Sequence, residues 1–371
     1  MSRPLRSRAL ALCVVLIATG INLVPGQAQG PLREPEAFLR KYIRLSAAEQ
    51  TAMQRGDAVA KLVQTSNKRE LAVGGVVRLA VPRDDFVSKI RDIVRYKTND
   101  AILQIGRFSD PPRIEDLAGL TMEPADLASL KKCKLGNCGL RMPAAEIERF
   151  RTEIDWTRKD SNARATLLAR QMILQYVKAY LAGGDSALAE YHDRKRALSL
   201  ADESRSLMAA SPYLLEYAPE FHSYLEKYPA GQLEKVENLI YWSKEKFGLK
   251  PVVSVTHMTI YTVTRDGVAN VIVSSKQLYA SRYFESSFAL TVFVEVAEPG
   301  PSPASYLIYL NRSRTDLLGG ILGGAKRSIV ESGMVRGVKK TLLVTKNRLE
   351  KDFRERLVTA AAVGDRDPSQ R

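Results

Sequence analysis

The clearest pattern in the chain is an alternation of apolar and polar residues that follows Pro251. Side chains of a strand point alternately to the two faces of a sheet, so a period of two indicates strands. The alternation predicts strands at 252–263, 268–280, 283–296 and 305–311. The sequence Arg265-Asp266-Gly267 favours a hairpin turn between the first two, and 299–303 is a Pro-rich turn before the last.

In the third of these strands the two faces differ sharply. Phe284, Phe288 and Leu290 share one face with the valines that follow them, whereas Glu285, Ser287 and other mostly polar residues share the opposite face. An antiparallel sheet with one buried face has this alternation. We therefore expect a one-sided antiparallel meander in the C-terminal part of the chain.

A helical pattern precedes the meander. Between Pro143 and Gly248, the residues Ala, Leu, Glu, Arg and Tyr dominate at helical spacing. The spacing predicts helices at 144–154, 161–182, 185–195, 201–210, 213–227 and 231–246. We expect a helical subdomain over 143–248, either inserted into the sheet domain or adjacent to it.

The N-terminal part, 30–142, mixes both patterns. Apolar residues at loose helical spacing predict helical structure over 34–64, with a break at Gly56. Branched residues predict strands at 71–81 and 98–108, and a short extended segment at 139–142. Between the first two strands, Asp84 or Asp85 is expected to cap a short helix over 84–93.

A long terminal helix is predicted from Asp316 to about Val358, so that 249–358 form the sheet and its helix, followed by a disordered tail at 359–371. The helix is rich in glycine, with Gly333 and Gly337 on one face, and its polar side is basic. Glycine inside a helix costs roughly 1 kcal/mol relative to alanine. Three interpretations stay open: a helix covering the sheet, a movable helix gating a cavity, and a helix at a membrane surface.

An early strand and short helix, a long antiparallel meander and a long C-terminal helix resemble the helix-grip fold of the START and polyketide-cyclase-like superfamily. The matching segments are 75–82 with the helix at 84–93, and 251–349. The chain has seven predicted strands, the usual number in the superfamily, and 143–248 would be an insertion. The resemblance implies an α+β fold with a cavity between sheet and helix that holds a hydrophobic ligand.

The cavity implied by the resemblance would be lined by apolar residues of the sheet and the helix. These candidate ligand-binding residues are Phe284, Phe288, Leu290, Tyr306, Ile308, Met334 and Val338. His257 shares a strand face with Thr259 and Tyr261, so His257 and Tyr261 could also project into it. Because pockets and cores use the same apolar residue types, simple core packing stays open for each of them.

The N-terminus has the three parts of a secretory signal. Three arginines precede an apolar run from Ala9 to Val24, and small residues follow up to Gly30. We expect 1–29 to be a cleaved signal peptide; an uncleaved anchor is the alternative, although the run is shorter than the ~20 residues that span a bilayer. The predicted location is periplasmic or secreted.

Export changes the interpretation of Cys133 and Cys138, which have four residues between them. In an oxidising compartment two such cysteines are expected to pair as a structural disulfide. A redox-active pair is the alternative, but the two-residue spacing that lowers a thiol pKa is missing.

The net charge of +15 indicates a basic protein, for which an anionic membrane surface is a candidate partner. Nucleic acid is not expected, because no nucleic-acid motif is present and the chain has an export signal. Arg312 and Arg314 follow the last predicted strand, where they could receive a phosphate or carboxylate, unless they only belong to a capped polar turn.

Catalytic motifs are missing from the sequence. The histidines His192, His222 and His257 lack metal-site spacing, and no serine-hydrolase elbow or phosphate loop is present. We expect no metal and no cofactor. The sequence predicts an exported, non-catalytic protein that binds an apolar small molecule or lipid. An envelope scaffold and an enzyme with His257 and Tyr261 in its pocket are the alternatives.

Overall fold

A computed structural model of the chain describes residues 35–246, 250–265, 268–296, 303–318 and 323–364. Several predicted features lie outside these ranges: the signal peptide, the turn residues Asp266 and Gly267, most of the Pro-rich turn, Gly319 and Gly320, and the last seven residues. Within the described ranges, no helix is both long enough and apolar enough to cross a bilayer.

The protein has an α+β fold built on one antiparallel sheet. Within the described residues, eight strands form it in the order β1-β2-β10-β9-β8-β7-β6-β3. The strands are β1 (Val59–Leu62), β2 (Glu70–Leu79), β3 (Ile102–Arg107), β6 (Val236–Glu245), β7 (Val252–Arg265), β8 (Val268–Ala280), β9 (Phe284–Val296) and β10 (Ala304–Thr315). A separate ribbon pairs β4 (Glu190–Tyr191) with β5 (Leu198–Ser199).

The helices fall into an N-terminal group, an insertion between β3 and β6, and one long C-terminal helix. The N-terminal group is α1 (Pro35–Phe38), η1 (Leu39–Ile43), α2 (Ala47–Gln54), α3 (Arg83–Arg91) and α4 (Ile93–Lys97). The insertion contains η2 (Ile114–Leu117), α5 (Pro124–Lys131), α6 (Ala144–Glu153), α7 (Ser161–Gly183), η3 (Gly184–Ala187), α8 (Leu200–Ala209), α9 (Pro212–Tyr217) and α10 (Pro219–Lys227). After η4 (Asp316–Leu318), α11 (Gly323–Gly364) ends the described chain.

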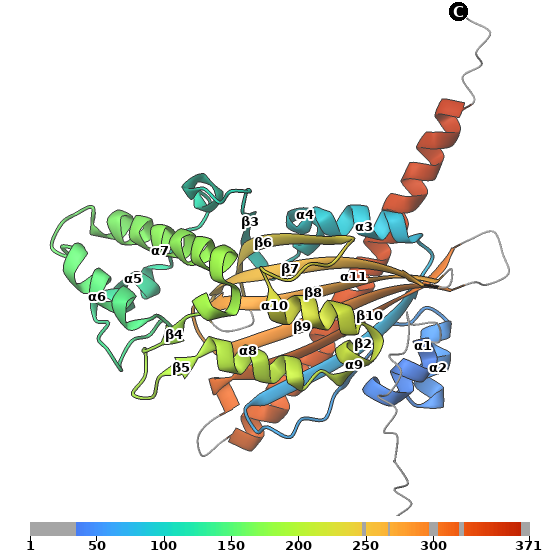
Figure 1. Cartoon of the computed structure of the whole chain (residues 1–371), viewed down its shortest axis with the longest axis horizontal. Coiled ribbons are helices and arrows are strands. Elements are labelled where there is room, and N and C mark those ends of the chain that lie inside the picture. Colours follow the sequence, from blue (N-terminus) through green and yellow to red (C-terminus); the bar gives the residue numbers. More distant parts are fainter. Residues whose placement is uncertain (1–34, 247–249, 266–267, 297–302, 319–322, 365–371) are drawn as a thin grey trace, which may run out of the picture.

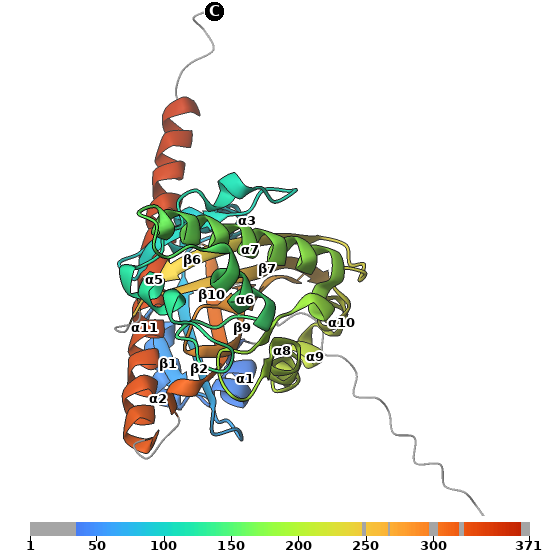
Figure 2. The same ribbon diagram turned by 90° about the vertical axis from the view of Figure 1, so that its left-hand side faces the viewer.

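The sheet is covered on both faces. In Figure 2 the strands run between α11 on one side and α8 to α10 on the other. One apolar cluster joins α11 and α3 to a sheet face that carries Phe293 and Leu307. A second cluster joins α1, η1 and α8 to α10 to the face that carries Phe288 and Ile308. The prediction of a sheet with only one buried face is therefore wrong, because both faces carry a hydrophobic core.

Adjacent glycines in β2 let a helical segment approach each face. A Cβ atom at Gly75 would lie 2.8 Å from Leu342 of α11, and one at Gly74 would lie 2.8 Å from Ile43 of η1. Successive strand residues face opposite sides, so the pair brings α11 and η1 against the same point of the strand. Among the described side chains of α11, Leu342 and Leu349 are buried, and both belong to the cluster on this face of the sheet.

Most predicted strands and helices are confirmed, with β2, β3 and β7 to β10 near their expected positions. The prediction of a helix at 231–246 is wrong, because this segment forms strand β6, which lies between β7 and the edge strand β3. Its residues Leu239 to Trp242 are buried in succession. A continuous apolar run fits a strand buried on both faces as well as a buried helix, so periodicity does not separate the two.

Three other local predictions are corrected. Helical structure ends before Gly56, which has a φ of +94°, and 59–62 form the edge strand β1. The helix expected at 185–195 is replaced by η3 and β4, which bring Tyr191 into the core, where its hydroxyl accepts a hydrogen bond from the Ala280 amide. Residues 139–142 form no strand.

The boundaries of two predicted helices also shift. α3 begins at Arg83 behind Pro82, with Asp84 and Asp85 in its first turn. α11 begins at Gly323 rather than at Asp316 and continues to Gly364, so that the first part of the expected disordered tail is helical.

Candidate functional site

The sheet separates the residues predicted to line one cavity. Phe288, Leu290, Tyr306 and Ile308 belong to the cluster under α1 and α8 to α10. Val338 of α11 packs against the cluster on the opposite face. Phe284 is half-buried at the start of β9, and Met334 is half-buried on α11. The seven residues therefore do not face one common space between the sheet and α11.

Leu290 does line a small cavity, but on the face away from α11. This cavity of about 20 Å³ lies between α9 and strands β8 and β9, beside Phe38 and Asn270. A single water molecule needs roughly 10–15 Å³. The cavity therefore has room for one water-sized group and not for a hydrophobic ligand.

His257 is buried in a hydrogen-bond chain. Tyr180 Oη lies 2.9 Å from Nδ1, and Nε2 lies 2.9 Å from Asn238 Oδ1. Because the Asn238 nitrogen donates to Tyr224, its oxygen accepts, so Nε2 carries the proton and Nδ1 accepts from Tyr180. Tyr261 donates to Glu220 and stacks on Phe221. Neither of the two cavities described here is lined by His257 or Tyr261.

The surroundings of His257 keep the imidazole neutral. Burial, assisted by the positive charge of Lys276, lowers the pKa of His257 to about 3. Both ring nitrogens already have partners within the chain. The residue is therefore held as a neutral structural group, far from the pKa that a general acid or base needs near neutral pH.

Arg312 and Arg314 lie on β10 rather than in a turn, because the strand extends to Thr315. Their guanidinium groups are mostly buried and point to the same face as Ile308. Arg312 pairs with Glu70, and Arg314 pairs with Glu203. Each arginine thus does receive a carboxylate, but the carboxylate belongs to the chain itself.

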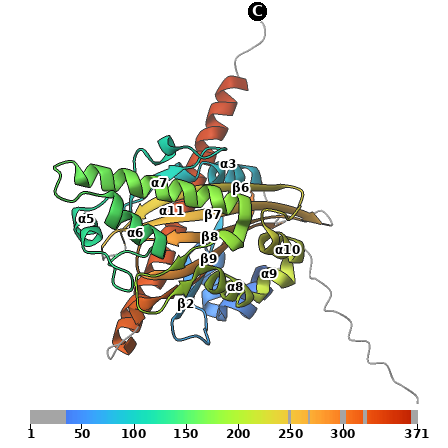
Figure 3. The same cartoon turned by 60° about the vertical axis from the view of Figure 1, so that its left-hand side comes forward.

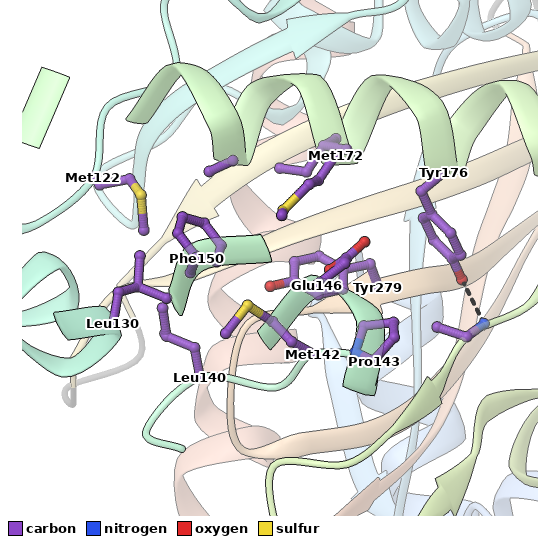
Figure 4. Close-up of a pocket in the computed structure, with 13 residues that line it drawn as sticks. Met122, Leu130, Leu140, Met142, Pro143, Glu146, Phe150, Met172, Tyr176 and Tyr279 are labelled. Carbon is purple, nitrogen blue, oxygen red and sulfur yellow. Dashed lines mark hydrogen bonds between the residues drawn. The ribbon is translucent and has the colours of Figure 1, made fainter. Parts of the chain in front are cut away.

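The larger of the two cavities lies in the insertion, where α5, α6 and α7 gather at one end of the sheet (Figure 3). Its volume is about 50 Å³. The lining combines three methionines, aromatic rings and one carboxyl group (Figure 4). The residues are Met122, Leu130, Leu140, Met142, Pro143, Glu146, Phe150, Ala169, Met172, Ile173, Tyr176, Ala189 and Tyr279. We call this space the methionine pocket.

Local covalent and ionic links hold the walls of the methionine pocket. A disulfide joins Cys133 to Cys138, between α5 and the segment that carries Leu140, and Cys133 is buried in the same apolar cluster. This confirms the predicted pair. Asp126 of α5 forms a buried ion pair with Arg282, next to the end of β8. The pocket therefore lies between a disulfide-bonded loop and the sheet.

Glu146 is the only ionisable carboxylate in the lining of the methionine pocket. It lies in the first turn of α6 and is half-buried among Met142, Met172 and Tyr279 (Figure 4). Among the described residues, Glu146 has no hydrogen-bond or ion-pair partner. The nearby Arg149 is already paired with Glu153 at 2.6 Å.

The two tyrosines of the pocket do not supply a proton to Glu146. Tyr176 donates its hydroxyl proton to the Leu278 carbonyl at 2.6 Å, and Tyr279 donates to the Arg141 carbonyl at 3.2 Å. A hydroxyl has one proton to donate. The half-buried carboxyl group of Glu146 therefore accepts no hydrogen bond from the described residues and faces an otherwise apolar lining.

Burial raises the pKa of Glu146 to about 7, although the positive charge of Arg149 acts in the opposite direction. Desolvation disfavours the charged form of a carboxyl group, which is the expected effect of an apolar pocket. Near neutral pH the group is thus balanced between a neutral donor and a charged acceptor. The pocket can hold an apolar group and place one polar contact against it.

The sequence-based candidates did not include Glu146, although helical spacing carries a signal for it. Glu146 precedes Phe150 by four residues, so both lie on one side of α6 next to the buried Ile147. This position on the buried side of an amphipathic helix distinguishes Glu146 from Glu148, which is exposed.

No group of three or more His, Cys, Asp and Glu side chains is placed to hold a metal ion in the part of the chain that the structure describes. A comparison with protein-family models finds no matching family, and a comparison with curated proteins finds no similar sequence.

Proposed function

We propose that this chain is a non-catalytic binding protein for an apolar small molecule, which it holds in the methionine pocket between α5, α6, α7 and β8. The observation that carries the proposal is the cavity itself, with Met122, Met142 and Met172 in its wall. Ligand pockets are mostly apolar with a few placed polar groups, and this lining has that composition.

The flexibility of methionine supports the proposal. A cavity of about 50 Å³ admits a short hydrocarbon group, whereas roughly 150 Å³ is known to hold a benzene ring. Methionine side chains are unbranched and have three rotatable bonds, so they adapt to ligands of different shape. Three of them in one wall allow the pocket to widen when a ligand enters.

The proposal includes export and a relation to the helix-grip superfamily. The Cys133–Cys138 disulfide supports export, because disulfides persist in oxidising compartments. Three features support the relation to the superfamily. Besides the edge strand β1, seven strands form one sheet, and α3 and α4 follow β2. In addition, α11 packs on one face of this sheet. In this proposal the ligand lies in the insertion and not beneath α11.

Methionine methyl groups offer a direct test. With ¹³C-methyl methionine in the protein, n-hexanol is expected to shift the NMR signals of Met122, Met142 and Met172. The signals of Met53 and Met258, which lie in other apolar clusters, should stay in place. These two residues act as internal controls for unspecific solvent effects.

A cavity-filling substitution completes the test. Ala169 lies in the pocket wall on α7, and Ala169→Trp is expected to abolish the hexanol-induced shifts. Ala163→Trp is the matched control, since Ala163 is exposed on the same helix. If hexanol left all three pocket signals unchanged, or shifted them equally in Ala169→Trp, the proposed function would be wrong.

A further inference from the structure

We infer that the ligand of the methionine pocket is an apolar amine, whose ammonium group binds the carboxylate of Glu146 while its hydrocarbon part lies among the methionines. This inference rests on the proposed function, because it names the ligand class of the same pocket. It starts from the one polar side chain of the lining that lacks a partner among the described residues.

Other buried carboxylates of the protein show what Glu146 lacks. Asp126 is paired with Arg282, Glu70 with Arg312, and Glu285 with Arg69. A buried charge without a partner is costly, so proteins usually pair it or leave it neutral. A carboxylate that faces a cavity and has no internal partner is suited to a cation that arrives from outside.

The lining of the pocket favours a cation over an anion. It contains no lysine or arginine, so nothing in it would compensate a negative ligand. It does contain the aromatic rings of Phe150, Tyr176 and Tyr279. Ring faces attract cations, and the tyrosine hydroxyl protons are already donated to backbone carbonyls. An ammonium group supplies the donors that Glu146 does not find among the described residues.

Hydrogen-bond counting also sets the polarity of the ligand. A primary amine carries up to three donors and, when protonated, no acceptor, which matches an acceptor-only carboxylate. An alcohol offers one donor without charge, and a carboxylate ligand would face like charge. We therefore expect affinity to decrease in the order amine, alcohol, carboxylate for the same hydrocarbon chain.

Three probes with one six-carbon chain test this order: n-hexylamine, n-hexanol and hexanoate. Binding is measured at pH 8 by the methionine methyl signals and by calorimetry. Hexylamine is expected to bind at least about tenfold more tightly than hexanol, since hydrogen bonds to charged groups exceed neutral ones by this order. Hexanoate is expected to bind most weakly.

Two variants separate charge from shape. Glu146→Gln keeps the size of the side chain and is expected to lower hexylamine affinity about tenfold, while hexanol affinity changes less than twofold. Glu148→Gln is the matched control, because Glu148 is exposed on the same helix and pairs with Arg151. The control should bind all three probes like the unchanged protein.

The pH dependence in the unchanged protein is an independent measurement. Hexylamine stays protonated below pH 9, like a lysine side chain. The groups that face Glu146 are Arg149 on its own helix, Tyr176 on α7, Tyr279 on β8 and Tyr191 on β4. The arginine stays charged and the tyrosines stay neutral, as their pKa values are raised. Hexylamine affinity should therefore fall as the pH drops through about 7, where Glu146 takes up its proton.

Each outcome decides between the two proposals. If hexylamine and hexanol bind equally, in both the unchanged protein and Glu146→Gln, the pocket holds apolar ligands but the amine inference is wrong. A preference for hexanoate would overturn the inference as well. If none of the probes binds, the proposed function itself fails.

Discussion

At the scale of single residues, His257 shows how the interior of this protein fixes a protonation state. Its imidazole donates to Asn238 and accepts from Tyr180, and burial lowers its pKa to about 3. An unfolded chain exposes the same ring with a pKa near 6.5. The unfolded state therefore binds a proton at a pH at which the folded state does not.

This difference predicts a pH-dependent stability. The contribution of His257 is fully present above about pH 6.5 and is lost as the pH falls from 6.5 toward 3. In this window His257→Gln should show a shallower loss of unfolding free energy, by up to about 1.4 kcal/mol per pH unit. Urea unfolding at several pH values between 4 and 8 measures the slope.

A direct NMR measurement of the protonation of the His257 ring separates this effect from other acid-induced changes. The NMR signals of the His257 imidazole should not titrate between pH 8 and pH 5. A midpoint near pH 6.5 for this ring, or equal slopes in both proteins, would contradict the assignment.

At the scale of elements, the C-terminal end of β10 places charged side chains between the sheet and the helices that cover it. Arg314 is mostly buried and binds Glu203 of α8, which also binds Arg69 at 3.0 Å. Removing one partner of a buried ion pair leaves the other charge uncompensated, which destabilises a protein more than replacing both partners with apolar residues. The ion pairs that join α8 to Arg314 and Arg69 thus both depend on Glu203.

We therefore expect Glu203→Gln to lower the unfolding free energy by about 3 kcal/mol. The neighbouring Asp202→Asn removes an exposed ion pair with Arg205 and is expected to cost below about 1 kcal/mol. Chemical denaturation of both variants gives the comparison. Equal costs for the two substitutions would show that the buried pair contributes no more than the exposed one.

At the scale of the whole molecule, α11 is divided between a packed part and a projecting part. Figure 1 shows its C-terminal end extending beyond the other elements. Leu342 and Leu349 are 4% and 2% exposed, whereas Leu357 and Val358 are 50% and 71% exposed. Among the side chains of α11 whose burial is described, those that are buried in the core lie in its middle turns.

Two truncations test this division. A chain that ends after Arg356 is expected to lose less than about 1 kcal/mol, because the first residues removed, Leu357, Val358 and Thr359, are exposed. A chain that ends after Lys340 loses Leu342 and Leu349 and should be destabilised by about 4 kcal/mol or more. Thermal unfolding measures both. A long truncation with an unchanged midpoint would mean that α11 is not part of the folding unit.

The exposed side of α11 carries Arg336, Lys339 and Lys340. They are part of the positive charge that makes an anionic membrane surface a candidate partner. This partnership stays a prediction, since it concerns the whole surface and not the pocket.

The sequence by itself determined the features that depend on local spacing. The alternation after Pro251 predicted β7 to β10, the helical spacing predicted α6 and α7, and the predicted export led to the expected disulfide of Cys133 and Cys138. Periodicity and short covalent loops are properties of neighbouring residues, so they can be read without knowing the fold.

Only the tertiary structure decided which elements meet. It made 236–245 an inner strand of the sheet, separated Ile308 from Val338 by the thickness of the sheet, and placed the half-buried Glu146 in the wall of a cavity. An apolar run indicates that a segment is buried, but it does not indicate which elements pack against it. A glutamate on a helix becomes unusual only when the residues around it offer no hydrogen-bond donor. The pocket depends on tertiary packing, because its lining residues come from segments far apart in the chain, from Met122 to Tyr279.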